Sequence, residues 1–136
     1  MTIFVINVGS VGYAKYSLKI IEKLCIYNHA HLFILDKDID QNINRVHPSW
    51  LKLFCHDIID DEFILCWDLD LIPTHLYALD DILDKESINM CYDGSYSSEN
   101  FTFNGKFKYN CGLIGIPKTY AEFFRSIYRS SFCTIF

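Results

Sequence analysis

The stretch Phe63-Ile64-Leu65-Cys66-Trp67-Asp68-Leu69-Asp70 carries the clearest fold signal in this chain. Five apolar residues run directly into two carboxylates, and a short continuous apolar run of this kind is typical of a strand buried on both faces. The carboxylates then lie just beyond the carboxyl end of that strand. In extended chain, an i, i+2 spacing places both on the same face, about 6–7 Å apart. The stretch therefore predicts a central strand that ends in an acidic site.

Apolar runs alternate with segments of helical periodicity on both sides of this stretch. We expect the other strands at residues 3–8, 32–35, 88–92 and 109–116, and helices that begin near Tyr13, Pro48, Pro73 and Thr119. Strands and helices in alternation are typical of a mostly parallel, Rossmann-like sheet flanked by helices. The prediction is thus an α/β fold forming a single domain over residues 1–136. Ligands of such sheets bind beyond the carboxyl ends of the strands.

Composition excludes several classes of protein. With 51% hydrophobic and 21% charged residues over 136 positions, the chain has the content of one folded domain. The longest uninterrupted apolar run covers residues 63–67, far short of the roughly 20 residues that a membrane helix needs. No basic segment opens the chain, so we expect a cytoplasmic protein without a membrane span.

The six cysteines lack CxxC spacing and are expected to be reduced thiols. A net charge of −5 argues against nucleic acid as a partner.

Asp68 and Asp70 are the first candidates for chemistry. Two carboxylates are hard oxygen donors, which suit Mg²⁺ or Mn²⁺ and not Zn²⁺. Phosphates and water usually supply the remaining ligands of such a cation. Asp-x-Asp is also common by chance and often does no more than end a strand, so the motif needs support from elsewhere in the chain.

Two further motifs accompany the carboxylates. Upstream, Trp50-Leu51-Lys52-Leu53 places one lysine in an otherwise apolar helical turn, and downstream Asn110-Cys111-Gly112 opens a strand. In this order the three motifs resemble the GT-A glycosyltransferases, especially the glycogenin-like and related hexosyltransferase families, over about residues 1–128. The resemblance implies a GT-A sheet and transfer of a sugar from a nucleotide-diphosphate sugar to an acceptor. It also implies Mn²⁺ or Mg²⁺ as cofactor.

The resemblance also implies a role for each matching residue. Asp70 is the direct metal ligand, Asp68 contacts the ribose and the metal, and Lys52 faces the diphosphate or sugar of the donor. Asn110 and Gly112 border the sugar and the acceptor. The implied catalytic set is Asp68, Asp70, Lys52 and Asn110, and the implied donor-binding set is Asn7, Val8, Gly9, Tyr13, Asp36, Lys52, Asp68, Leu69, Asp70, Asn110 and Gly112. In that set residues 7–9 help to hold the nucleotide base, with Tyr13 and Asp36 as weaker candidates.

Simpler interpretations of the same residues stay open. Lys52 also fits a surface lysine that lays its stem along apolar neighbours, and Asn110 also fits a turn residue beside a glycine. The resembling families take a further metal ligand from a histidine near their C-terminal end. Here the five histidines are at positions 29, 31, 47, 56 and 75. The expectation is therefore either a minimal or truncated member of these families, or a member whose metal site is completed differently.

Three other functions compete with sugar transfer. The first is a non-catalytic protein that binds a nucleotide sugar through the same fold. The second is a haloacid-dehalogenase-like phosphatase, in which Asp68 is the nucleophile and Asp70 the general acid, although here the motif follows the third strand and not the first. The third is a dinucleotide-binding protein, but the segment Gly9-Ser10-Val11-Gly12 does not match G-x-G-x-x-G. The sugar, the base, the acceptor and the oligomeric state stay undetermined.

Overall fold

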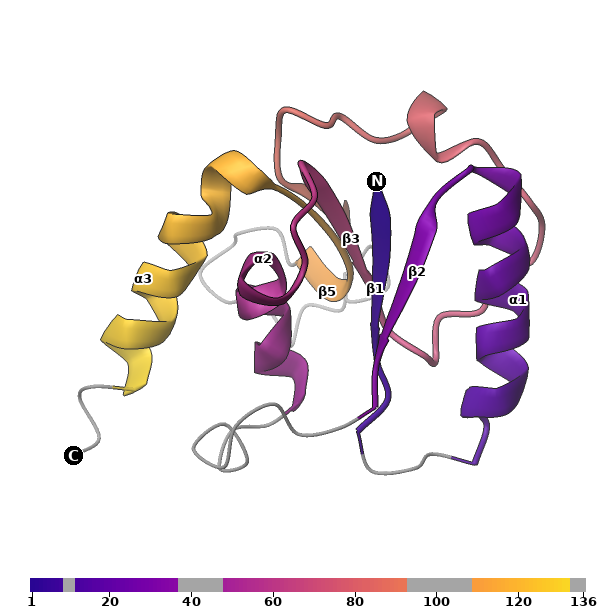
Figure 1. The fold of residues 1–136 in the computed structure, drawn as a ribbon, viewed down its shortest axis with the longest axis horizontal. Helices are drawn as coiled ribbons and strands as arrows, with labels where there is room; N and C mark the ends of the chain where they lie inside the picture. Colours follow the sequence, from indigo (N-terminus) through magenta and orange to yellow (C-terminus); the bar gives the residue numbers. More distant parts are fainter. Residues whose placement is uncertain (9–11, 37–47, 93–108, 133–136) are drawn as a thin grey trace, which may run out of the picture.

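A computed structural model of the chain describes residues 1–8, 12–36, 48–92 and 109–132 (Figure 1). The strands are β1 (Thr2–Ile6), β2 (His31–Leu35), β3 (Phe63–Trp67), β4 (Asn89–Tyr92) and β5 (Tyr109–Pro117). The α-helices are α1 (Ala14–Tyr27), α2 (Cys55–Ile58) and α3 (Ala121–Phe132), and the 3₁₀-helices are η2 (Pro48–Phe54), η3 (Leu79–Asp81) and η5 (Lys118–Tyr120). The expected alternation of strands and helices is confirmed.

The five strands form one sheet in the order β2-β1-β3-β5-β4. β1 pairs in parallel with both β2 and β3, whereas β5 is antiparallel to β3 and to β4. β5 alone therefore runs against the common direction, and the prediction of a mostly parallel sheet in an α/β fold is confirmed. The reversal of β5 also determines which strand ends lie together. It brings the start of β5 to the edge where β1 and β3 end.

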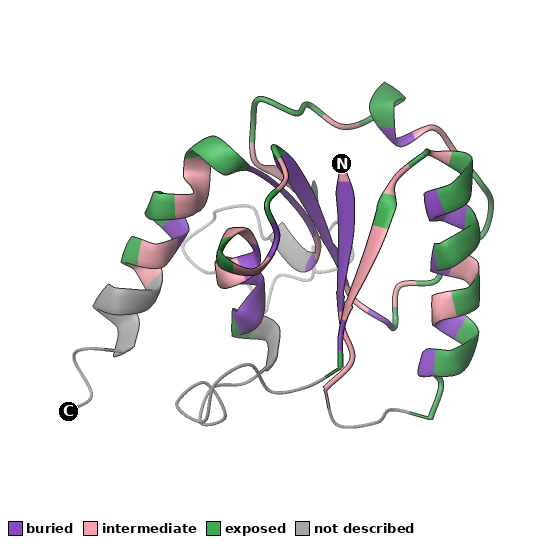
Figure 2. Ribbon diagram, in the orientation of Figure 1, coloured by how far each residue is buried: buried purple, intermediate pink, exposed green. Residues whose placement is uncertain are grey.

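Helices cover both faces of the sheet (Figure 1). α1 packs on one face, while η2, α2 and α3 lie on the other. The side chains of β3 pack on both faces of the sheet, because alternate side chains of a strand point in opposite directions. Phe63, Leu65 and Trp67 belong to the apolar cluster on the α1 face, and Ile64 and Cys66 to the cluster on the α2 face. Every β3 residue is buried (Figure 2), as the uninterrupted apolar run predicts.

The prediction of a helix that begins near Pro73 is wrong. Only the short turn η3 forms in this segment, and the residues before it have no regular secondary structure. The side chain of Asn28 explains the difference, because its Nδ2 donates to the carbonyl of Tyr77 (3.1 Å) and its Oδ1 accepts from the Leu79 amide (2.6 Å). Backbone groups that a helix would pair internally are thus bonded to the end of α1. Leu79 is nonetheless fully buried.

Two other helix starts differ in detail from the expectation. The helix from Pro48 forms, but as η2 followed by the single turn α2. The last helix, expected to begin near Thr119, begins with η5, which contains Thr119, and continues as α3. Within the described residues, no helix has the length and apolar character to cross a bilayer. The described cysteine side chains, Cys25, Cys55, Cys66 and Cys91, are free thiols, as expected.

Candidate functional site

Several of the predicted site residues lie at the edge of the sheet where β1 and β3 end. The Asn7 amide, directly after β1, donates to the Leu35 carbonyl at the end of β2 (2.7 Å). The Asp68 amide, directly after β3, donates to the Gly112 carbonyl of β5 (2.8 Å). The first strand end, the acidic motif and the start of β5 therefore share one edge. Their proximity depends on the antiparallel direction of β5.

The acidic motif is a turn and not a continuation of the strand. The Leu71 amide donates to the Asp68 carbonyl (3.0 Å), which closes a turn over residues 68–71. Leu69, between the two carboxylates, is buried in the cluster on the α1 face. The expectation that Asp68 and Asp70 share one face of an extended strand is therefore wrong. The turn leaves Asp70 exposed and holds Asp68 half-buried.

Lys52 forms the most specific contact of the site. Its ammonium Nζ lies 2.6 Å from Oδ1 of Asp68, a short charge-assisted hydrogen bond. The Lys52 side chain is 6% exposed, and its neighbours Leu51 and Cys55 belong to the cluster on the α2 face. The alternative of a surface lysine is therefore wrong. η2 carries Lys52 through the apolar layer to the sheet edge, where the ion pair orients the first carboxylate of the motif.

Two buried thiols, Cys66 and Cys55, lie near this ion pair. Cys66 lies two residues before Asp68 on β3 and is fully buried. Burial raises the pKa of the Cys66 thiol well above its usual value, and the neighbouring Cys55 thiol raises it further. The thiol is therefore uncharged at neutral pH and does not compete with Asp68 for the Lys52 ammonium.

Asn7 brings an unsatisfied acceptor to the same edge. Its side-chain Oδ1 is buried and has no hydrogen-bond donor among the described residues. An unsatisfied buried polar atom costs about 1–3 kcal/mol, so a ligand that donated to Oδ1 would recover that free energy. This atom is a signal that sequence motifs do not contain, because it depends on how β1 ends within the fold.

The remaining predicted residues lie as follows. Val8 is half-buried after β1, Asp36 is exposed after β2, and Tyr13 is 46% exposed directly before α1. The backbone of Asn110 pairs with Cys91 of β4. The prediction on Gly9, and that on the Asn110 side chain, fall outside the part of the chain that the structure describes.

The donor set fits a hard cation that brings other ligands with it. Among the described residues, no three or more His, Cys, Asp or Glu side chains are grouped for a metal ion. Asp68 and Asp70 supply carboxylate oxygens beside solvent, and Mg²⁺ or Mn²⁺ is commonly bound by one or two carboxylates plus water and phosphates. His56 does not contribute at this edge, since its Nε2 lies 2.9 Å from the Ile116 carbonyl near the other end of β3.

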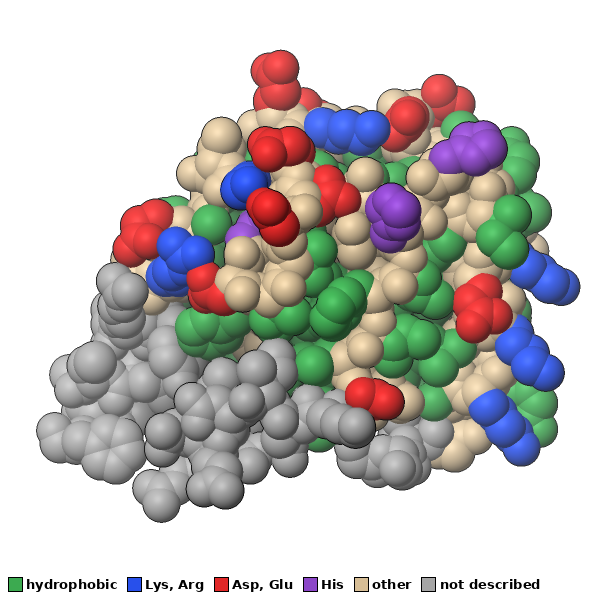
Figure 3. Space-filling view, in the orientation of Figure 1, with side chains coloured by type: hydrophobic (Ala, Val, Ile, Leu, Met, Phe, Trp, Pro, Cys, Tyr) green, Lys and Arg blue, Asp and Glu red, His purple; other side chains and the backbone are tan. Residues whose placement is uncertain are grey.

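Charged side chains elsewhere pair with one another near the opposite edge. The Lys118 Nζ lies 2.8 Å from Asp60 and 3.5 Å from Glu62, and Lys85 lies 2.7 Å from Asp80. Acidic and basic side chains alternate over this upper end of the molecule in Figure 3. All of these pairs involve largely exposed side chains, so the buried lysine of the Lys52–Asp68 pair sets it apart from them.

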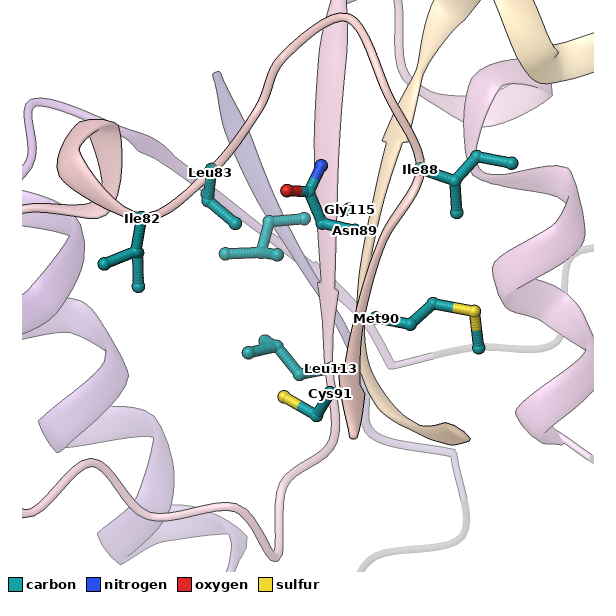
Figure 4. A pocket seen from close by; sticks show the side chains of 9 residues that line it. Ile82, Leu83, Ile88, Asn89, Met90, Cys91, Leu113 and Gly115 are labelled. Carbon is teal, nitrogen blue, oxygen red and sulfur yellow. The ribbon is translucent and has the colours of Figure 1, made fainter. Parts of the chain in front are cut away.

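An apolar cavity of about 330 Å³ lies between the sheet and residues 82–83. Ile82, Leu83, Leu113 and Cys91 point into it (Figure 4). Its lining suits hydrocarbon and offers no cation for a diphosphate. The candidate donor site is therefore the edge with Lys52 and not this cavity. Sequence reasoning missed the cavity because it depends on the irregular course of the chain after η3.

Comparisons with known proteins show what this fold resembles. No protein-family profile matches the chain, and no curated protein sequence matches it either. Solved structures do match it, and two of them are glycosyltransferases. One is a glycosyltransferase involved in the glycosylation of the major capsid of PBCV-1, with a TM-score of 0.64 and 12% identity over 94% of this chain and 65% of that chain. The other is the apo form of glycosyltransferase GlyE from Streptococcus pneumoniae TIGR4, with a TM-score of 0.53 and 19% identity over 96% of this chain and 37% of that one. The chain thus has a glycosyltransferase-like fold and spans less than two thirds of either structure.

Proposed function

We propose that this chain binds a nucleotide-diphosphate sugar and transfers its sugar to an acceptor in a metal-dependent reaction. The observation that carries the proposal is the Lys52–Asp68 ion pair, with its lysine 6% exposed, at the edge where β1, β3 and β5 meet. The fold that this chain shares with two glycosyltransferases supports it. In sheets of this kind, ligands bind beyond the strand ends.

The leaving group of the reaction explains the charge arrangement. Breaking a glycosyl–phosphate bond leaves negative charge on a nucleoside diphosphate, and Mn²⁺ or Mg²⁺ bound there acts as a Lewis acid. In the proposal Asp70, exposed on the turn, would hold that cation directly, and Asp68 would supply the second carboxylate. Lys52 adds fixed positive charge where charge develops, which is worth most where water is excluded.

The remaining residues of the edge suit the two ends of the donor. The unsatisfied Oδ1 of Asn7 is suited to accept a hydrogen bond from the nucleotide base, with Val8, Tyr13 and Asp36 beside the same strand ends. Gly112 carries no side chain and pairs through its carbonyl with the Asp68 amide. In the proposal Gly112 and Asn110 border the sugar and the acceptor.

A second candidate is a non-catalytic protein that binds the nucleotide sugar by the same contacts. The absence of a third His, Cys, Asp or Glu ligand near Asp68 and Asp70, within the described residues, favours it. The two functions share the donor site and differ only in turnover.

The test is a thermal-shift panel of UDP, GDP and their sugar conjugates, with and without Mn²⁺. A ligand that binds the native state raises the melting temperature by mass action. We expect a rise with at least one nucleoside diphosphate that grows when Mn²⁺ is added. Asp70→Asn should remove the Mn²⁺-dependent part, because it removes the charge that the cation needs. Asp81→Asn, an exposed carboxylate in η3, is the matched control.

Turnover separates the candidate functions. Sugar transfer or hydrolysis by the wild type, lost in Asp70→Asn, supports the transferase. Metal-dependent nucleotide binding without turnover supports the non-catalytic protein. Release of phosphate from simple monoesters with a phosphoryl group trapped on Asp68 would support the phosphatase instead. A wild type that binds no nucleotide, with or without Mn²⁺, would reject the proposed donor site.

A further inference from the structure

Asp68 lies between two environments. On one side its Oδ1 is 2.6 Å from the buried ammonium of Lys52, and on the other its side chain is 40% exposed to solvent at the sheet edge. A cation that approaches from solvent therefore meets a carboxylate that is already paired with an internal cation. This arrangement bears on the order in which ligands enter the site.

We infer that Lys52 and a divalent cation compete for Asp68, so that the cation enters the site together with the nucleotide diphosphate and not before it. The inference rests on the proposed function and adds to it the coupling between the two ligands. Lys52 is a positioning residue in this inference, acting on the cation through Asp68.

The competition is electrostatic and not steric. The exposed part of Asp68 leaves space for a cation on the solvent side. A divalent ion there would nevertheless lie near the Lys52 ammonium, and like charges repel more strongly when one of them is shielded from water, as the 6% exposed Lys52 side chain is. A bare cation is thus attracted by Asp68 and Asp70 and repelled by Lys52. Its affinity in the absence of nucleotide should be low.

A diphosphate changes this balance. The packing around Lys52 keeps its ammonium at the edge of the core. Leu51, beside it in η2, is 3% exposed to solvent, and Cys55, directly after η2, is 1% exposed. Moving an Asp68 oxygen toward a cation takes negative charge away from a buried ammonium, which is costly. The phosphates of a nucleotide bring negative charge to both Lys52 and the cation. Nucleotide and cation should therefore raise each other's affinity by the same factor.

The experiment measures Mn²⁺ binding without nucleotide, by the electron paramagnetic resonance signal of free Mn²⁺, in wild type and Lys52→Met. Because the lysine charge is what repels the bare cation, we expect Lys52→Met to bind Mn²⁺ alone at least about tenfold more tightly than wild type, a change of about 1.4 kcal/mol. The factor by which UDP or GDP tightens Mn²⁺ binding should fall in the same variant. Lys118→Met is the matched control, since it removes an equal charge from the Lys118–Asp60 pair (2.8 Å) near the opposite edge.

The possible outcomes test the competition for Asp68 and the proposed function separately. If Lys52→Met binds bare Mn²⁺ no more tightly than wild type, while wild type shows Mn²⁺-dependent nucleotide binding, the competition is overturned and the proposed function stands. If wild type binds neither ligand, both fall. Lys52→Gln, which keeps a polar end without the charge, repeats the measurement should Lys52→Met fail to fold. An equal gain in Lys118→Met would show a general charge effect and also overturn the inference.

Discussion

The Nζ of Lys52 lies 2.6 Å from Oδ1 of Asp68, and the two side chains differ in exposure, at 6% for the lysine and 40% for the aspartate. The contributions of the partners to stability are therefore unequal. An Asp68 carboxylate that loses Lys52 can be hydrated, whereas a Lys52 ammonium that loses this carboxylate remains largely out of water. Breaking the pair from the aspartate side is the more costly change.

Asp68→Asn should lower the free energy of unfolding by about 2 kcal/mol. Removing one partner of a fully buried pair costs about 3–5 kcal/mol, and the half-exposed position of Asp68 reduces that figure. Lys52→Met should cost less, and the double variant should be more stable than Asp68→Asn alone. Urea unfolding without metal measures all three. A larger loss in Lys52→Met than in Asp68→Asn would contradict the argument.

Gly115→Ala should destabilise the sheet by about 1–3 kcal/mol, as overpacking of a core does. A Cβ added at Gly115 would lie 2.6 Å from Cζ of Phe63 and 3.2 Å from Cβ of Asn89. Phe63 is buried and cannot move its ring into solvent. The control is Gly12→Ala, where an added Cβ meets nothing within 4 Å. Thermal unfolding compares the two, and equal melting temperatures would show that the Phe63 ring adapts.

Asn28→Ala should cost about 2–3 kcal/mol. The change leaves the amide of Leu79 without its acceptor in a fully buried position and removes the donor to the Tyr77 carbonyl. Ser126→Ala, which removes a hydrogen bond to Phe123 on the exposed surface of α3, should change stability by less than about 0.5 kcal/mol. Chemical denaturation of both variants tests the contrast. A minor effect in Asn28→Ala would mean that water replaces these bonds.

Thiol labelling should distinguish the described cysteines. Cys91 is exposed and should react with iodoacetamide in the native protein at pH 7.5, whereas Cys25, Cys55 and Cys66 are buried and should react only after unfolding. Burial, with a smaller contribution from Glu22, raises the pKa of Cys25 to about 11, which reduces the reactive thiolate further. Peptide mapping by mass spectrometry locates the label. Native labelling of Cys66 at the rate of Cys91 would show that the core beside Lys52 opens.

Local pattern alone predicted much of this fold. The run Phe63–Trp67 specifies a strand buried on both faces, because five consecutive apolar side chains alternate into two cores. The helical periodicity after Tyr13 specifies α1, but not the face that packs on the sheet: Tyr16 and Tyr27, which share the helical spacing of Leu24, are exposed, and the buried residues are Ala14, Ser17, Ile21, Leu24 and Cys25. The same reasoning failed after Pro73. There the apolar spacing suits a helix, but the side chain of Asn28, 51 positions before Leu79, bonds the backbone groups that a helix requires.

By itself the sequence determined the α/β class and the acidic motif at the end of a buried strand, since both follow from the spacing of residues within one segment. The tertiary structure decided the direction of β5, which brings Gly112 beside Asp68, and the burial of Lys52 against that carboxylate. It also decided that Asp68 and Asp70 lie on a turn. These relationships join segments far apart in the chain, and their free energies depend on solvent exclusion and on charge at short distance, neither of which is a property of any one segment.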